Sequence, residues 1–258
     1  MRLKCTKCGH GFWYRIRRDY FRCKKCKRDF KPRRLPLNLS RAQWRELLAW
    51  FMREQSVDAI SNETGLERKR VLRALAYVRR AMAHDVPASF SGTVEVDETY
   101  FGGQWKNKRR RIRDRGTKRG RGTTKQPVFG ILCRDGRVWA EVVSNVEAAT
   151  LQPLISNRVK RGSIVNSDTF KSYTGIAANG YVHRLVNHGE GEYVRGRAHV
   201  NGLEGFWGYL KRKLAAKGGV RKERLPLYLA EYVWRYNHRH LDKRLKINRL
   251  MTLMKNES

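Results

Sequence analysis

The stretch TVEVDETYFGG, residues 93–103, decides the fold of the larger part of this chain. Its first five residues predict a strand, Thr93–Asp97, that carries a carboxylate at its end. Two further strands are expected over residues 128–132 and 138–143, because the turn residues Asp135-Gly136 stand between them. The region that begins at Ser91 therefore opens as a sheet.

Helices and short strands alternate after these three strands. The pattern predicts helices over residues 147–160, 169–178 and 199–214, short strands over 164–165 and 182–186, and a last helix near 225–240 that packs against the sheet. This order indicates an α/β layer architecture for residues 90–245. Residues 246–258 are polar and basic, and we expect a polar C-terminal tail there.

Three carboxylates stand out in this α/β region. Asp97 ends the first strand, Asp168 follows the apolar strand at 164–165, and Glu204 lies on the helix over 199–214. Acids at strand ends, with one on a facing helix, can hold two divalent cations about 4 Å apart for phosphoryl transfer. Mg²⁺ or Mn²⁺ suits such ligands. The alternative is a set of solvated acids, but only 23 acids occur in this very basic chain.

Two polar residues share the helix with Glu204. Lys211 follows Glu204 by seven residues, and Asn201 precedes it by three, so all three lie on approximately one face. We expect Lys211, with its neighbour Arg212, to hold a DNA phosphate. The alternative for Lys211 is a surface salt bridge of little consequence.

Four of the five cysteines form two CxxC pairs. Such pairs at nearly this spacing are typical of a tetrahedral zinc site, whereas the alternative, two disulfides, requires a secreted protein. We predict a zinc ribbon over residues 1–34 that needs a structural Zn²⁺ to fold, with the ligands Cys5, Cys8, Cys23 and Cys26. His10 follows Cys8 by only two residues and is expected to be a bystander. Cys133 lies in an apolar run and is expected to be a small buried hydrophobe.

Residues 38–86 resemble a helix-turn-helix module. Ser40 is a candidate N-cap for a first helix, Gly65 ends a second, and a third begins near Arg68. The first helix repeats apolar residues at helical spacing, namely Trp44, Leu47, Leu48 and Phe51. The third begins with basic residues where recognition helices meet bases, so we predict DNA contacts by Arg68, Lys69 and Arg70. The alternative is a helical bundle with a solvated basic face.

The net charge points to a polyanionic partner. The chain has 57 Lys+Arg against 23 Asp+Glu, which gives a formal net charge of +34 in 258 residues. This charge disfavours an ordinary metabolic enzyme and favours nucleic acid as the partner. No apolar run of membrane-spanning length and no signal peptide is visible, so we expect no membrane partner and a cytoplasmic, nucleoid-associated location.

A basic segment interrupts the α/β region. Residues 106–125 contain 11 Lys+Arg against the single acid Asp114, with no periodicity, which indicates a loop. We expect it to neutralise DNA phosphates through Arg109, Arg110 and Arg111. The alternative is a disordered charged loop without a specific role. Trp105 and Trp207 are candidates for stacking on unpaired bases, and helix packing is the alternative for Trp207.

Three blocks of sequence together resemble the DDE transposases of bacterial insertion sequences, and in particular the ISXO-like group with an N-terminal zinc ribbon. The blocks are VDETYFGG at 96–103, SDTFKSY at 167–173 and HVNGLEGFW at 199–207 followed by Lys211-Arg212; YNHR at 236–239 is also similar. The resemblance implies a ribonuclease-H-like fold, a mixed sheet flanked by helices with the acids at one edge. It also implies Mg²⁺-dependent cleavage at terminal inverted repeats and strand transfer into target DNA.

The resemblance also implies residue roles. Asp97 and Asp168 correspond to metal ligands, Glu204 to the third acid and Lys211 to a lysine near the DNA. The third position in this group can be Asn, and Asn201 is the other candidate here. We favour Glu204 because a carboxylate binds a hard cation better than an amide, and Asn201 and His199 are then expected to contact DNA or support the site. Because two DNA ends must meet, a homo-oligomer is expected in the active complex.

Two other functions compete with a transposase. A DNA-binding regulator with a catalytically inactive ribonuclease-H-like domain would keep the first two modules but would not need the acids. A basic RNA-binding protein of the ribosomal type is seldom this long with two CxxC pairs. No GxxxxGK[ST] motif is visible, which agrees with strand exchange that does not use a nucleotide.

Overall fold

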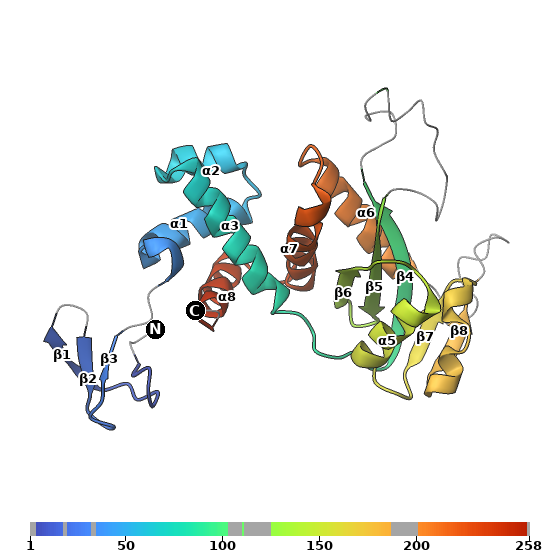
Figure 1. Ribbon diagram of the computed structural model, residues 1–258, viewed down its shortest axis with the longest axis horizontal. Coiled ribbons are helices and arrows are strands. Elements are labelled where there is room, and N and C mark those ends of the chain that lie inside the picture. The colour runs from blue at the N-terminus through green and yellow to red at the C-terminus, as the bar shows by residue number, and fades with distance from the viewer. Residues whose placement is uncertain are drawn as a thin grey trace. The chain divides into compact units, whose positions relative to one another are not determined.

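The computed structural model describes residues 4–17, 20–31, 35–102, 110, 125–186 and 201–256. The chain divides into two compact units. One comprises residues 1–81 with 242–258, and the other comprises residues 82–241. Figure 1 shows their helices and strands. None of the described helices is long and apolar enough to cross a membrane.

The first unit begins with a small antiparallel sheet. Its strands β1 (Trp13–Arg17), β2 (Tyr20–Cys23) and β3 (Asp29–Phe30) are ordered β1-β2-β3. The core beneath them holds only Cys5, Cys23 and Phe30, with half-buried aromatic neighbours. A core of so few side chains cannot offset the conformational entropy of folding by itself.

Three helices follow, as the sequence predicts. They are α1 (Arg41–Met52), α2 (Val57–Thr64) and α3 (Arg68–Ala83). Ser40 and Gln43 form a reciprocal capping box at the start of α1, and Gly65 ends α2 with a left-handed φ of 63°. All four apolar residues predicted for the inner face of α1 are buried. The helical module is therefore confirmed, and its DNA contacts remain a prediction.

The predicted polar tail over residues 246–258 is wrong. Residues Lys243–Asn256 form helix α8, which packs on α1 in the first unit. Its buried residues Ile247, Leu250, Met251 and Met254 are spaced i, i+3, i+4, i+7, a helical period that the intervening basic residues conceal. The Tyr77 hydroxyl donates a 2.9 Å hydrogen bond to the Met254 carbonyl. The last helix thus belongs with the N-terminal helices, so the proposed boundary at residue 245 also moves, to about residue 241.

The second unit is built on a mixed five-stranded sheet in the order β6-β5-β4-β7-β8. The strands are β4 (Thr93–Phe101), β5 (Gln126–Cys133), β6 (Val138–Val142), β7 (Ile164–Ser167) and β8 (Val182–Leu185). The β4-β5 and β5-β6 pairs are antiparallel, whereas the β4-β7 and β7-β8 pairs are parallel. The first three strands form the hairpin-linked half that the sequence predicts.

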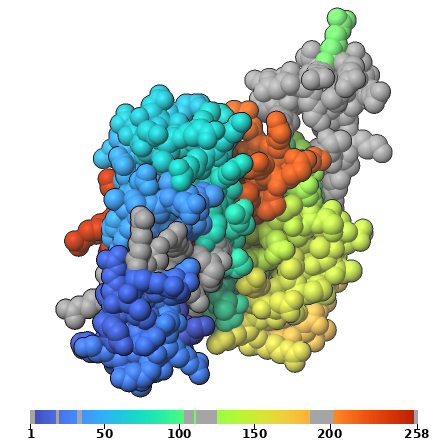
Figure 2. Space-filling model, turned by 60° about the vertical axis from the view of Figure 1, so that its left-hand side comes forward, coloured from blue at the N-terminus to red at the C-terminus, as the bar shows by residue number. Residues whose placement is uncertain are grey.

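Helices cover both faces of this sheet. On one face, α5 (Ala148–Arg158) packs Leu151 and Ile155 onto a core that includes Val94 and Val96 of β4. On the other face, α6 (Asn201–Ala215) and α7 (Leu225–Asn237) share a core with β4, β5 and β6. Figure 2 shows the orange residues of α6 directly against the green part of the sheet. The predicted α/β class, a mixed sheet flanked by helices, is confirmed.

One predicted helix is absent from this unit. Instead of a helix over residues 169–178, the chain makes two short 3₁₀ turns, Lys171–Tyr173 and Ile176–Asn179. Gly175 lies between them with a left-handed φ of 88°, which a continuous α-helix does not accommodate. The segment therefore stays close to the sheet edge after Asp168.

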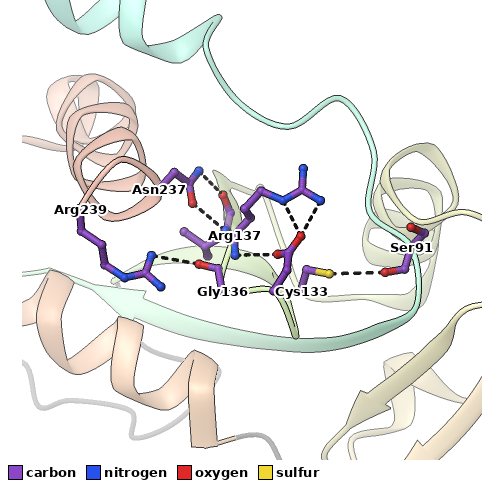
Figure 3. Close-up of polar contacts among 8 residues, drawn as sticks. Ser91, Cys133, Gly136, Arg137, Asn237 and Arg239 are labelled. Atoms are coloured by element: carbon purple, nitrogen blue, oxygen red, sulfur yellow. Dashed lines mark hydrogen bonds and ion pairs between the residues drawn. The ribbon is translucent and has the colours of Figure 1, made fainter. Parts of the chain in front are cut away.

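The YNHR block at residues 236–239 attaches α7 to the edge of the sheet. The Asn237 side chain accepts a hydrogen bond from the Val138 N–H and donates one to the Val138 carbonyl, each 2.8 Å long. Arg239 donates a 3.1 Å hydrogen bond to the Gly136 carbonyl in the hairpin turn (Figure 3). These contacts satisfy backbone groups of the edge strand β6 that would otherwise lack partners.

Candidate catalytic site and metal centre

Asp97 lies within β4 rather than at its end, which corrects the predicted strand boundary. β4 continues to Phe101 beside β5, but its parallel partner β7 ends at Ser167. The last parallel pair is Glu95 with Asn166, two residues before Asp97 and Asp168, and the negative charge of Asp168 is near enough to raise the pKa of Asp97. The two predicted metal ligands thus meet where β7 leaves the sheet.

Burial makes Asp97 an unusual carboxylate. The pKa of Asp97 is raised to about 7, mainly by burial and further by the negative charges of Glu98 and Asp168. Hydrogen bonds from the Trp207 indole and the Glu98 backbone oppose the rise. A desolvated acid next to two others is strongly stabilised by a cation, because opposite charge favours its ionised form. The donor set therefore fits a hard divalent cation.

Asp168 is fixed by the turn that follows it. Its Oδ1 accepts a 3.0 Å hydrogen bond from the backbone N–H of Phe170, and the residue is half-buried. The adjacent Ser167 hydroxyl lies 2.8 Å from Nε2 of His183 on β8. The carboxylate is thus held at the sheet edge and keeps its other oxygen for a ligand.

Trp207 of α6 packs on the sheet and contacts Asp97. Its indole Nε1 donates a 2.9 Å hydrogen bond to Oδ2 of Asp97. The ring lies over Gly130, which pairs with Asp97 across β4 and β5, and a Cβ at residue 130 would stand 2.6 Å from two ring carbons. The side chain is 3% exposed. Packing, rather than base stacking, is therefore its role in this structure.

Glu204 and Lys211 are both exposed on α6. Glu204 does not form a close cluster with Asp97 and Asp168. In the described part of the chain, the only group of three or more possible metal ligands whose atoms lie within 4.8 Å of one another is the cysteine cluster. Trp207 follows Glu204 by three residues, and residues at this spacing are neighbours on a helix surface. Glu204 therefore lies on the helix edge next to the side chain that contacts Asp97.

Several residues near the site escaped sequence reasoning. Tyr173 donates a 2.6 Å hydrogen bond to Oε2 of Glu98, and burial, followed by the charge of Glu98, raises the pKa of Tyr173. Glu95 is buried, and its Oε2 accepts a 2.9 Å hydrogen bond from the Leu203 N–H. The alternation of side chains along a strand, which puts Glu95 and Asp97 on one face, is the signal that could have found Glu95.

The predicted DNA-contacting residues are differently engaged. Lys69 is exposed at the start of α3, and Arg68 is exposed but forms a 2.6 Å ion pair with Asp58. Arg70 donates a 2.6 Å hydrogen bond to the Leu37 carbonyl, so this guanidinium ties α3 to the segment before α1. Arg212 is exposed on α6 beside Lys211, and Arg110 is exposed. Four other residues considered above lie outside the described part of the chain: Trp105, Arg109, Arg111 and His199.

The four predicted zinc ligands do come together. The Sγ atoms of Cys5, Cys8, Cys23 and Cys26 all lie within 4.8 Å of one another. The Cys5–Cys26 separation is 3.7 Å and the Cys8–Cys23 separation is 3.5 Å. Four sulfurs at about 2.3 Å from a tetrahedral zinc ion are about 3.8 Å apart, so the cluster fits this metal.

Two cysteines of the cluster differ in how readily they form the thiolate that a metal requires. Despite a hydrogen bond from the backbone of His10, burial and hydrogen bonds with the other three thiols raise the pKa of Cys8 to about 11. Burial raises the pKa of the Cys23 thiol, but hydrogen bonds from the backbone N–H groups of Cys26 and Lys25 outweigh it and lower that pKa to about 7. Cys133 lies apart, is buried, and donates a 3.4 Å contact to the Ser91 carbonyl. The cluster therefore could bind a metal ion, and the fifth cysteine is separate from it.

The fold and site define an α/β protein with adjacent carboxylates at the edge of a mixed sheet and a four-thiol cluster near its N-terminus. A family model for ISXO2-like transposase domains matches residues 89–237. The chain is 31% identical over 237 residues, 85% of its length, to a protein of the transposable element ISH50 in Halobacterium salinarum, and covers 78% of that protein. It is 37% identical over 111 residues to a transposase-like protein of Haemophilus influenzae, which is 43% of this chain and 89% of that one.

The chain belongs to the ISXO2-like transposase family. Among solved structures, the catalytic core domain of BIV integrase is similar with 16% identity and a TM-score of 0.34, over 54% of this chain and 80% of that one. The family model and the relatives from insertion sequences confirm the predicted membership in the DDE transposases of insertion sequences.

Proposed function

We propose that this chain binds the terminal inverted repeats of an insertion sequence, cleaves DNA strands there and transfers them into target DNA. The observation that carries the proposal is that Asp168 lies close enough to Asp97 for its charge to raise the pKa of Asp97, with α6 attached to Asp97 through Trp207. Family membership supports it, because the two acids coincide with the residues that the sequence blocks single out.

Asp97, Asp168 and Glu204 are the proposed ligands of catalytic Mg²⁺ or Mn²⁺. The geometry of α6 favours Glu204 over Asn201 as the third catalytic residue. Glu204 precedes Trp207 by three residues, which puts their Cβ atoms about 5–6 Å apart. Asn201 precedes Trp207 by six residues, about 9 Å along the helix axis. The residue nearer to the Asp97 contact is the better partner for Asp97, and Asn201 is left to contact DNA.

The proposed chemistry proceeds in two balanced steps. In the first, water attacks the phosphorus at the element end, a P–O bond to water forms, and the P–O3′ bond breaks to leave a 3′-hydroxyl and a 5′-phosphate. In the second, that 3′-hydroxyl attacks a target phosphodiester, loses its proton, and releases the target's own 3′-hydroxyl. When bound by Asp97, Asp168 and Glu204, the cations would activate the attacking oxygen and neutralise the leaving oxygen. No nucleotide is consumed, because one phosphodiester replaces another.

Positive side chains on each of the two units would hold the double-stranded DNA. Lys211 and Arg212 are exposed on the helix of Glu204, and Lys69 and Arg68 are exposed at the start of α3. Arg109, Arg110 and Arg111 would add phosphate contacts from the basic loop. The charge of +34 supports binding driven largely by counterion release. A homo-oligomer would bring two element ends together, in the cytoplasm and on the nucleoid.

Zn²⁺ would be held by Cys5, Cys8, Cys23 and Cys26. The small apolar core of β1, β2 and β3 explains why a metal would be needed there, since the binding free energy of the ion becomes folding free energy. The folded ribbon would then present its basic residues to the inverted repeat.

The test is strand cleavage of a duplex that carries the element's own end, with Mg²⁺ or Mn²⁺. Asp97→Asn, Asp168→Asn and Glu204→Gln should each abolish cleavage without weakening DNA binding. Glu141→Gln is the matched control, because Glu141 is exposed on β6 and points to the opposite face from Asp97. DNA binding without cleavage by the unaltered protein would instead identify a regulator with an inactive catalytic domain.

A further inference from the structure

Glu95 is a buried carboxylate that the proposed chemistry does not use. It lies two residues before Asp97 on the same face of β4 and is 5% exposed. A carboxylate is costly to bury unless hydrogen bonds or charges compensate for the lost water. Its neighbour on β7, Asn166, is polar and fully buried. The chain thus maintains a polar pair beneath the catalytic edge where aliphatic residues would fit a core.

The first turn of α6 supplies the compensation. Oε2 of Glu95 accepts a 2.9 Å hydrogen bond from the N–H of Leu203, the third residue of the helix. N–H groups in a first helical turn lack partners within the helix, and a helix N-terminus attracts negative charge. Gly202 permits the approach, since a Cβ there would lie 3.0 Å from Oε2 and 3.2 Å from Oε1 of Glu95.

Glu95 and Asp97 together fix the register between strand and helix. Glu95 binds Leu203 and Asp97 binds Trp207, so a step of two residues along β4 matches a step of four along α6. Two strand residues span about 6.8 Å, and four helical residues rise about 6 Å. Two contacts at matching spacing restrain both the sliding and the rotation of α6 on the sheet. Glu204, the residue after Leu203, takes its position from this attachment.

We propose that Glu95 is a positioning residue that anchors the start of α6 by capping Leu203 and thereby sets Glu204 relative to Asp97 and Asp168. The inference rests on the proposed function, because it assigns Glu95 a role in the geometry of that same site. It requires the hydrogen-bond acceptor and the length of the Glu95 side chain, and it does not require the negative charge.

Two conservative substitutions in the full-length protein separate reach from charge. Glu95→Gln keeps an acceptor oxygen within reach of the Leu203 N–H and removes the negative charge. Glu95→Asp keeps the negative charge, but its side chain is one methylene shorter, so the carboxylate lies further from the Leu203 N–H. Both are compared with the unaltered protein, with Asp97→Asn and with the exposed-acid control Glu141→Gln. The readouts are the cleavage rate on saturating end DNA, the Mn²⁺ concentration for half-maximal cleavage, DNA affinity without divalent cation, and the melting temperature.

Glu95→Gln should cleave within about threefold of the unaltered protein, whereas Glu95→Asp should lose on the order of tenfold or more, because misplacement of about 1 Å is that costly. Glu95→Asp should also need more Mn²⁺ and bind DNA normally. Gly202→Ala, which pushes a Cβ onto the carboxylate, should reproduce the Glu95→Asp defect, including in a preparation whose melting temperature is unchanged.

The reverse order, with Glu95→Asp active and Glu95→Gln as inactive as Asp97→Asn, would overturn the proposal and identify Glu95 as a charge that acts on the cation. Equal and normal cleavage by both variants would overturn it as well. Failure of the proposed function itself looks different, because Asp97→Asn would then cleave like the unaltered protein whatever the Glu95 variants do.

Discussion

The indole Nε1 of Trp207 lies 2.9 Å from Oδ2 of Asp97 and donates a hydrogen bond to it. This contact joins α6, which carries one proposed metal ligand, to β4, which carries another. It exists because Gly130 on β5 leaves space for the ring, where any Cβ would stand 2.6 Å from it. Oδ2 of Asp97 is thus oriented by α6.

Trp207→Phe should lower the cleavage rate on the order of tenfold while the protein stays folded, because the ring still packs over Gly130 but Asp97 loses its donor. A hydrogen bond to a charged group contributes about 1.5–3 kcal/mol, so a modest decrease in unfolding free energy should accompany it. Trp139→Phe is the control, since Trp139 is buried on the opposite face of the sheet. Equal cleavage rates for the two variants would remove Trp207 from the orientation of Asp97.

In the absence of Mg²⁺ and Mn²⁺, with zinc retained, the stability of the protein should fall as pH rises. The pKa of Asp97 is raised from 3.8 to about 7, chiefly by burial, so between these values the native state binds a proton that the unfolded state has released. Unfolding free energy then decreases with pH across this interval. Melting temperatures measured between about pH 5 and pH 8 should decline for the unaltered protein and less steeply for Asp97→Asn. Identical slopes for the two proteins would refute the raised pKa.

Cys23→Ser should abolish zinc binding by the N-terminal ribbon, because three thiolates cannot complete the four-sulfur cluster and the small core beneath it cannot fold alone. Metal analysis should find one zinc per unaltered chain. Cys133→Ser is the matched control, because Cys133 is buried outside the cluster. Full zinc content in Cys23→Ser would show that the site is not the proposed four-thiolate one.

Asn237→Ala should destabilise the second unit by about 1–3 kcal/mol, because it leaves the buried N–H and C=O of Val138 without partners. Thermal or denaturant unfolding measures the loss, and Asn179→Ala, at an exposed position, should change little. A cost for Asn237→Ala no larger than that of Asn179→Ala would mean that α7 does not depend on this contact.

Affinity for end DNA should decrease steeply with salt, because the basic side chains release counterions from phosphates. Lys69→Ala should weaken binding and reduce the slope of log affinity against log salt by about one. Lys160→Ala serves as a control for loss of charge, since Lys160 is exposed after α5 and has no proposed DNA contact. A slope unaffected by Lys69→Ala would exclude a phosphate contact by this lysine.

The sequence reveals the parts of the protein whose signals are local. The CxxC pairs predict the cysteine cluster, Gly65 predicts the break before α3, and the apolar strands predict the sheet. Helix α8 escaped because its four apolar residues stand among basic ones and bury against α1, about 200 residues away in sequence. The boundary of β4 escaped because the pairing that extends it beyond Asp97 comes from β5 alone.

In the candidate site, too, local sequence signals indicate the residues, whereas the contacts between them are visible only in the structure. Asp97, Asp168 and Glu204 are recognisable from their blocks, but the attachments that organise them are long-range. The Trp207–Asp97 and Leu203–Glu95 contacts join residues separated by more than 100 positions. Both contacts require glycine nearby, because a Cβ at Gly130 would collide with the Trp207 ring and a Cβ at Gly202 would press on the Glu95 carboxylate. The sequence alone does not show which side chains lie next to these two glycines.

The most direct test of the central claim is metal-dependent cleavage by Asp97→Cys on a duplex that carries the element's end. A thiolate is a softer ligand that Mg²⁺ accepts less well than Mn²⁺ does. If Asp97 binds a catalytic cation, this variant should bind DNA normally, fail to cleave with Mg²⁺ and regain cleavage with Mn²⁺. Cleavage with Mg²⁺ at the rate of the unaltered protein would contradict the account.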